Sequence, residues 1–155
     1  MAVCQPCQRI KKGMEDQQAT NMTWMVVEDN QAIRDIIATM CELWGFNALI
    51  FKDGHQASAY LAVMDPPPPL PDVALLDIRV PGPWGHEIGA LIRQHPKLHN
   101  IGVILMTAYE LGGTDAADYL QASGADQLIY KPLPPMDDLL DLVVRVVSAR
   151  QALAS

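Results

Sequence analysis

Short apolar runs alternate with amphipathic segments along most of the chain. The runs that are typical of buried strands occupy residues 24–28, 48–51, 73–77, 101–107 and 128–130. Between and after them, apolar residues recur at helical spacing over 30–43, 56–64, 86–94, 114–122 and 136–153. Strands that alternate with helices in this way predict an α/β domain, in which helices cover both faces of a parallel sheet.

The helical periods also predict which side chains face the sheet. We expect these to be Ile33, Ile36, Ile37, Met40, Ala57, Tyr60, Leu61, Met64, Ile88, Leu91, Ile92, Leu139, Leu140, Val143, Val146 and Val147. Asn30 is placed to cap the first helix, and Gly45 to end it. The histidines lie on predicted helices and loops, where we expect surface positions: His55, His86, His95 and His99.

Four of the apolar runs end in polar residues. Glu28 ends the first run and Asp29 follows it, Asp77 ends the third, Thr107 ends the fourth, and Lys131 follows the last. In an open α/β sheet the carboxyl ends of the strands lie at one edge, so these side chains can converge on a single site.

The chemistry of these groups points to a metal-assisted phosphoryl acceptor. Three neighbouring carboxylates repel one another, and a hard cation such as Mg²⁺ relieves that repulsion. A bound Mg²⁺ and the Lys131 amine would neutralise phosphoryl oxygens, and the Thr107 hydroxyl would donate to another. Asp77 is then the candidate nucleophile, which would form an aspartyl-phosphate.

Together these motifs resemble the receiver domain of two-component response regulators, over about residues 23 to 150. The residues that carry the resemblance, in chain order, are Glu28-Asp29, Asp77, Thr107-Ala108 and Lys131-Pro132. Each motif alone is weak, whereas the ordered set on four strand ends is specific. The resemblance implies a flavodoxin-like (βα)₅ fold with strand order 2-1-3-4-5.

The resemblance also implies the function. A histidine kinase or phosphotransfer protein would phosphorylate Asp77. Asp29 would bind Mg²⁺ directly and Glu28 through water, with Asp77 and the Arg79 carbonyl as further ligands. Phosphorylation would move Thr107 and change a protein-binding face built from the fourth helix, fifth strand and last helix. Such a module catalyses only its own phosphorylation and dephosphorylation.

The chain departs from the family pattern at several positions. The switch aromatic of many receivers, three residues before the lysine, is Leu128 here, and an aromatic stands instead at Tyr130. Arg79 and Tyr109 are expected to flank the approach of water to the phosphoryl group, which favours slow dephosphorylation. The resemblance further implies a cis peptide bond between Lys131 and Pro132.

Three alternatives remain open from the sequence. An aspartyl-phosphate phosphohydrolase usually has a second acid two residues after its nucleophile, where this chain has Arg79. A flavin-binding protein of the same fold needs a phosphate-binding loop after the first strand, where Glu28 and Asp29 would repel phosphate. A receiver-like module that binds proteins without being phosphorylated is the third.

Composition sets further bounds. A chain of 155 residues, half of them hydrophobic, suits one globular domain, and its net charge of −7 argues against a nucleic-acid surface. No apolar stretch reaches the roughly 18 residues of a membrane span. An odd number of cysteines, 3, argues against a disulfide framework and favours a cytoplasmic location.

The domain boundaries follow from the onset of the pattern. Residues 23–155 form the expected receiver domain, and residues 1–22 an N-terminal extension in which Cys4 and Cys7 have no identified role. The proline run at 66–71 is interpreted as a stiff spacer. Because little sequence follows the last helix, we expect a stand-alone receiver with a downstream protein target and no DNA-binding part.

Overall fold

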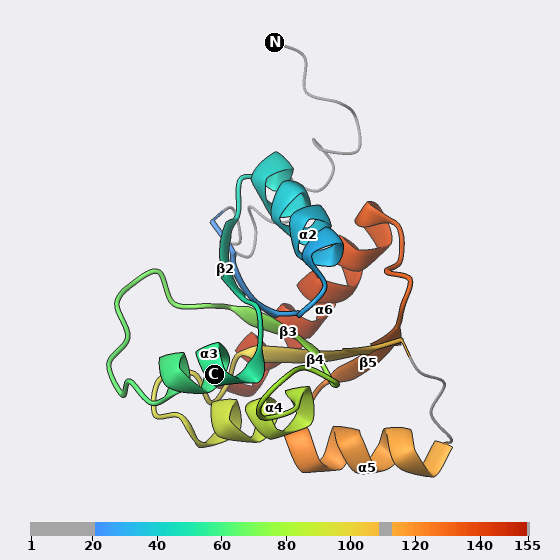
Figure 1. Ribbon diagram of the computed structural model, residues 1–155. Helices are drawn as coiled ribbons and strands as arrows, with labels where there is room; N and C mark the ends of the chain where they lie inside the picture. The colour runs from blue at the N-terminus through green and yellow to red at the C-terminus, as the bar shows by residue number, and fades with distance from the viewer. Residues whose placement is uncertain (1–20, 109–112, 155) are drawn as a thin grey trace.

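The computed structural model describes residues 21–108 and 113–154, drawn as a ribbon in Figure 1. Its elements, in chain order, are β1 (Thr23–Val27), α2 (Gln31–Trp44), β2 (Asn47–Phe51), α3 (Gly54–Leu61), β3 (Val73–Asp77), α4 (Gly85–Gln94), β4 (Gly102–Thr107), α5 (Gly113–Ser123), β5 (Gln127–Tyr130) and α6 (Met136–Ala154). The strands are parallel and lie in the order β2-β1-β3-β4-β5, which confirms the expected flavodoxin-like topology.

Each face of the sheet carries its own hydrophobic cluster, because successive side chains of a strand point to opposite faces. Trp24 and Val26 of β1 lie in the cluster covered by α2 and α6. Met25 and Val27 lie in the cluster covered by α3 and α4, against which α5 also packs through Tyr119. Figure 1 shows this division, with α2 and α6 on one side of the sheet and α3, α4 and α5 on the other.

The ends of α2 follow from local chemistry. The Asn30 side chain accepts a hydrogen bond from the backbone N–H of Ile33, so it satisfies one of the free donors of the first turn. Gly45 ends the helix with φ of 78°, a left-handed conformation that favours glycine. Both expectations are confirmed: Asn30 starts α2 just after the carboxyl end of β1, and Gly45 ends it just before β2.

Three side chains that were expected to face the sheet are exposed instead. Ile36, Met64 and Leu91 keep 53%, 56% and 37% of their accessible surface. Ile36 and Leu91 each precede a buried isoleucine, and a helix turns by about 100° per residue, so they point off the buried stripe. Helix α3 ends at Leu61, so Met64 lies beyond it in the following loop.

His95 was expected at the surface, and this expectation is wrong because the residue is buried, with 2% exposure. Its Nδ1 accepts hydrogen bonds from the backbone N–H groups of Lys97 and Leu98, at 3.1 and 3.2 Å. Its Nε2 lies 2.8 Å from the carbonyl oxygen of Val63. His95 therefore fastens the loop after α3 to the end of α4, a role that its sequence position does not reveal.

The remaining expectations concern the N-terminal extension, the proline run and membrane-spanning helices. Met22 is buried in the cluster under α2 and α6, with 2% exposure. Cys4 and Cys7 lie outside the described residues. Residues 66–71 join α3 to β3, which agrees with their interpretation as a connecting segment. Among the helices described, none has the length and apolar character needed to span a membrane.

Candidate functional site

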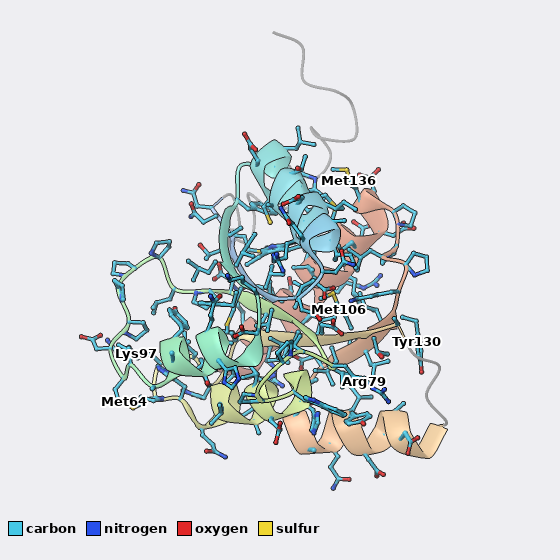
Figure 2. The ribbon with its side chains drawn as sticks, viewed as in Figure 1. Met64, Arg79, Lys97, Met106, Tyr130 and Met136 are labelled. Atoms are coloured by element: carbon cyan, nitrogen blue, oxygen red, sulfur yellow. The ribbon has the colours of Figure 1, made fainter. Side chains whose placement is uncertain are left out.

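The parallel strands bring the polar strand ends to one edge of the sheet. Val27 pairs with Leu76, so Glu28 lies beside Asp77, while Thr107 pairs with Tyr130, so Lys131 follows directly alongside. In the view of Figure 2, Met106 and Tyr130 mark this side of the sheet, and Met64 lies at the opposite side. The expected convergence is therefore observed.

The acids form a compact cluster. Glu28, Asp29 and Asp77 each offer a carboxylate oxygen, and these oxygens lie within 4.8 Å of one another. Glu28 is fully buried and Asp77 nearly so, whereas Asp29 is exposed. Arg34 donates from Nη1 to the backbone carbonyls of both Glu28 and Asp29, at 2.8 Å each. The guanidinium on α2 thus fixes the backbone that presents two of the three acids.

Lys131 neutralises part of this charge. Its Nζ lies 3.1 Å from Asp77 Oδ2 and also contacts Glu28 Oε1. Burial raises the pKa of Glu28, and its hydrogen bond and charge interaction with Asp77 raise that pKa further, while Lys131 acts to lower it. Burial acts to lower the pKa of Lys131, but the two carboxylates outweigh it and raise that pKa. The amine therefore remains charged at neutral pH and sits between two acids.

The backbone between β4 and β5 places the lysine next to the threonine. The N–H of Lys131 donates to the carbonyl oxygen of Thr107 at 2.8 Å, and Thr107 itself is buried, with 2% exposure. The peptide bond between Lys131 and Pro132 is cis, which confirms the expectation from the family resemblance. Tyr109, expected beside the site, lies outside the described residues.

The loop after β3 closes tightly onto the strand that carries Asp77. The N–H of Gly85 donates to the carbonyl oxygen of Ile78 at 2.9 Å, which brings the start of α4 against the end of β3. A Cβ atom on Gly85 would lie 2.3 Å from the carbonyl oxygen of Asp77, so only glycine permits this approach. Arg79 is exposed, and its guanidinium carbon lies 5.6 Å from the centre of the Trp84 ring.

The donor set fits a hard divalent cation. The three carboxylates provide the oxygen ligands that Mg²⁺ prefers, and one of them is exposed, which leaves room for water and for an incoming oxygen. The upward shift in the pKa of Glu28 reports the unfavourable burial and crowding of negative charge that a cation would relieve. Glu28, Asp29 and Asp77 are therefore the residues that could hold the metal.

Sequence reasoning missed two residues of this site. Arg34 lies in an amphipathic helix, where an arginine is ordinarily a solvated charge, and only the fold brings it under the acidic loop. Gly85 follows a proline-rich and glycine-rich loop, so its composition is typical of a turn. Its close approach to Asp77 depends on the angle at which α4 packs on β3.

Comparison with known proteins gives the same family as the motifs. A sequence model of the response regulator receiver domain matches residues 24–144. The chain is 31% identical over 115 residues to the phosphate regulon transcriptional regulatory protein PhoB of Pseudomonas aeruginosa, an alignment that covers 74% of this chain and 47% of PhoB. It is 35% identical over 127 residues to the DNA-binding transcriptional regulator NtrC of Salmonella typhimurium, covering 81% of this chain and 25% of NtrC.

Solved structures show the same fold. A CheY-like receiver domain protein from Methanospirillum hungatei superposes with a TM-score of 0.70 at 22% identity, covering 85% of this chain and 98% of that one. The receiver domain of a sensor histidine kinase from Pseudomonas aeruginosa, solved with magnesium in its active-site cleft, gives a TM-score of 0.68 at 26% identity, covering 83% and 98%. The chain thus spans half or less of the length of the transcriptional regulators above, and nearly all of these receiver domains.

Proposed function

Since this chain belongs to the response regulator receiver domain family, we propose that it accepts a phosphoryl group on Asp77 from a histidine kinase or phosphotransfer protein. Receiver domains are signalling modules of two-component systems rather than enzymes that turn over a substrate. The observation that carries the proposal is the contact of Lys131 with both Glu28 and Asp77 at the edge of the sheet.

The geometry around Asp77 suits an acceptor of phosphoryl groups. Its carboxylate is nearly buried yet lies next to the exposed Asp29, so one side of the cluster remains open to a donor. Lys131 is already placed against Asp77 Oδ2 and would neutralise charge on the transferred group. Thr107 ends the neighbouring part of the sheet, where its hydroxyl would donate to a phosphoryl oxygen.

Mg²⁺ is the cofactor that this site would use. Asp29 and Asp77 would bind it directly, Glu28 would act through water, and the backbone carbonyl of Arg79 would complete the protein ligands. When bound, the cation would offset the negative charge that builds up during phosphoryl transfer. The crystallised receiver with magnesium in its cleft supports this proposal, because its alignment covers 83% of this chain.

The signal would leave the domain through a change at the face formed by α5, β5 and α6. Repositioning of Thr107 and of the segment that follows it would shift this face between two states and so alter the binding of a protein partner. A downstream protein target, the stand-alone character of the receiver and its cytoplasmic location stay predictions.

Incubation with acetyl phosphate and Mg²⁺, followed by intact mass measurement, tests the proposal. The wild-type chain should gain the mass of one phosphoryl group. Asp77→Asn should gain none, whereas the control Asp141→Asn, at an exposed position on α6, should behave as wild type. Asp29→Ala should lose metal-dependent phosphorylation together with Mg²⁺ affinity in a titration.

This experiment, together with an assay of phosphate release from a small ester, separates the alternatives. Phosphoryl gain by Asp77→Asn at the wild-type rate would refute the assignment of the acceptor. A wild-type chain that gains no mass from acetyl phosphate or from phosphorylated donor proteins would favour a non-phosphorylated binding module. Rapid release of phosphate from a small phosphate ester would favour a phosphohydrolase.

A further inference from the structure

A column of rings runs from the loop after β3 to helix α5. The guanidinium of Arg79 lies over the ring of Trp84, and the Trp84 and His86 rings meet edge to face, with centroids 6.0 Å apart and planes at 78°. The His86 ring then packs on Tyr119 of α5, with centroids 4.7 Å apart and planes at 57°. These contacts connect the residue two positions after Asp77 with the middle of α5.

The start of this column is fixed to the phosphoryl site. Gly85 lies between the two rings in sequence, and its N–H donates to the carbonyl oxygen of Ile78. Its Cα has no room for a side chain beside the Asp77 carbonyl. The backbone N–H of Trp84 also donates to Glu87 Oε2 at 2.7 Å, so the first turn of α4 is held from both sides. The backbone that carries Trp84 and His86 therefore packs directly on the end of β3, where it would feel a displacement of that strand end.

The other end of α5 is held by different contacts. A Cβ on Gly89 would lie 2.8 Å from the Cβ of Ser123, so α4 and α5 approach closely near the end of α5. The Arg93 side chain donates from Nε to the carbonyl oxygen of Gly124 at 2.9 Å. The last turn of α5 is thus fastened to α4, and the contact between His86 and Tyr119 lies one turn closer to the start of the helix.

His86 is suited to a ring contact rather than to a surface charge. It was expected at the surface, but its side chain is half-buried, and no hydrogen-bond partner of its buried Nδ1 is found among the described residues. Burial lowers its pKa, although the charge of Glu87 acts to raise it. A position in the first turn of a helix also disfavours a cation. The imidazole is therefore neutral at physiological pH and packs as an aromatic ring.

We infer that the contact between His86 and Tyr119 couples the phosphorylation of Asp77 to the position of α5. This inference rests on the proposed phosphorylation and names the route by which it is read out. The position of the usual switch aromatic is Leu128, which packs among the hydrophobic residues under α3 and α4. The ring column supplies a second physical connection between the site and the same helix, made through the loop after β3 rather than through β5.

Hydrogen exchange with mass spectrometry tests the coupling separately from phosphorylation. Wild-type protein, phosphorylated with acetyl phosphate and Mg²⁺, should show a change in amide exchange over residues 115–123 relative to the unphosphorylated form. His86→Ala should reach the same phosphorylated fraction by intact mass, while its exchange change in α5 falls at least about threefold. A threefold change lies near the lower end of the range by which single mutations between two sites change the coupling of those sites.

Conservative variants distinguish a ring contact from general damage to the fold. His86→Phe and Tyr119→Phe keep the rings and should keep the exchange change, whereas Tyr119→Leu should lose it as His86→Ala does. His99→Ala removes an exposed histidine just before β4 and should have no effect. Thermal unfolding of each variant confirms that it is folded at the temperature of the exchange measurement.

Two outcomes would overturn the inference and leave the proposed function standing. If His86→Ala and Tyr119→Leu are phosphorylated and retain the full exchange change in α5, the ring contact does not carry the signal. The same holds if phosphorylated wild type shows no change in α5. A wild-type chain that gains no phosphoryl mass from any donor would instead refute the proposed function, and the inference with it.

Discussion

Replacing Gly85 by alanine tests how the site is held together. The added Cβ would lie 2.3 Å from the carbonyl oxygen of Asp77, 2.8 Å from its carbonyl carbon and 3.0 Å from Cα of Ile78. Non-bonded heavy atoms prefer separations of about 3.5–4.0 Å, so the start of α4 and the end of β3 must move apart by roughly 1 Å. Every clashing atom belongs to the backbone, so no flexible side chain can absorb the shift.

The expected loss of stability in Gly85→Ala follows from two opposing effects. Forcing extra volume into a packed site costs about 1–3 kcal/mol, and the upper end applies to a backbone clash. Alanine favours a helix over glycine by at most about 1 kcal/mol, which offsets only part of that cost. A net loss of about 2 kcal/mol corresponds to a fall in Tm of about 4–8 °C for a domain of this size. The displaced Asp77 should also accept phosphate more slowly, by about tenfold to a hundredfold, since a misplacement of about 1 Å has effects of that order.

The assay pairs thermal unfolding with the rate of mass gain from acetyl phosphate and Mg²⁺. Gly45→Ala is the matched control, because its φ of 78° disfavours alanine while a Cβ there meets nothing within 4 Å. It should lower Tm through a backbone cost of about 1–2 kcal/mol and leave the phosphorylation rate unchanged. If Gly85→Ala shows wild-type Tm and a wild-type rate, the close packing of α4 on β3 does not position Asp77.

Three further predictions concern charge at and near the site. Burial raises the pKa of Glu28, so Glu28→Gln should raise Tm at neutral pH when no metal is present. The same change should reduce the stabilisation by Mg²⁺, which for wild type is about 1.4 kcal/mol when the metal concentration is ten times Kd. A lower metal-free Tm in the variant would contradict this. The pKa of His86 is lowered in the folded state, so its contribution to stability is complete above the ordinary histidine value of about 6.5 and is lost as the pH falls through the folded-state pKa. The free energy of unfolding should therefore fall less between pH 7 and pH 5 in His86→Phe than in wild type. Arg79→Asn should speed loss of the phosphoryl mass after donor removal, by about tenfold, equivalent to about 1.4 kcal/mol of barrier, and an unchanged decay would show that this side chain does not limit access of water.

The sequence by itself determined the order of the elements and the chemistry of the site. Apolar runs bounded by helical periods predict a parallel sheet, because a strand buried on both faces needs apolar residues at every position. The acids at 28, 29 and 77 could be grouped from the sequence alone, since strand ends of a parallel sheet meet at one edge. The fold, its strand order and the cis bond before Pro132 were expected from the family resemblance and are confirmed.

The tertiary structure decided which side chains touch, because contact depends on helix rotation and packing angle rather than on local pattern. A helix turns by about 100° per residue, so Ile36 is exposed although the next residue, Ile37, is buried. The buried ring of His95 contacts the carbonyl oxygen of Val63, which lies 32 positions earlier in the chain. The pairing of Lys131 with Glu28 joins residues from opposite ends of the domain, and the contact between His86 and Tyr119 exists only because α4 and α5 pack side by side. A sequence supplies the groups in order along a line, and only the packing of helices on the sheet sets the distances at which those groups act.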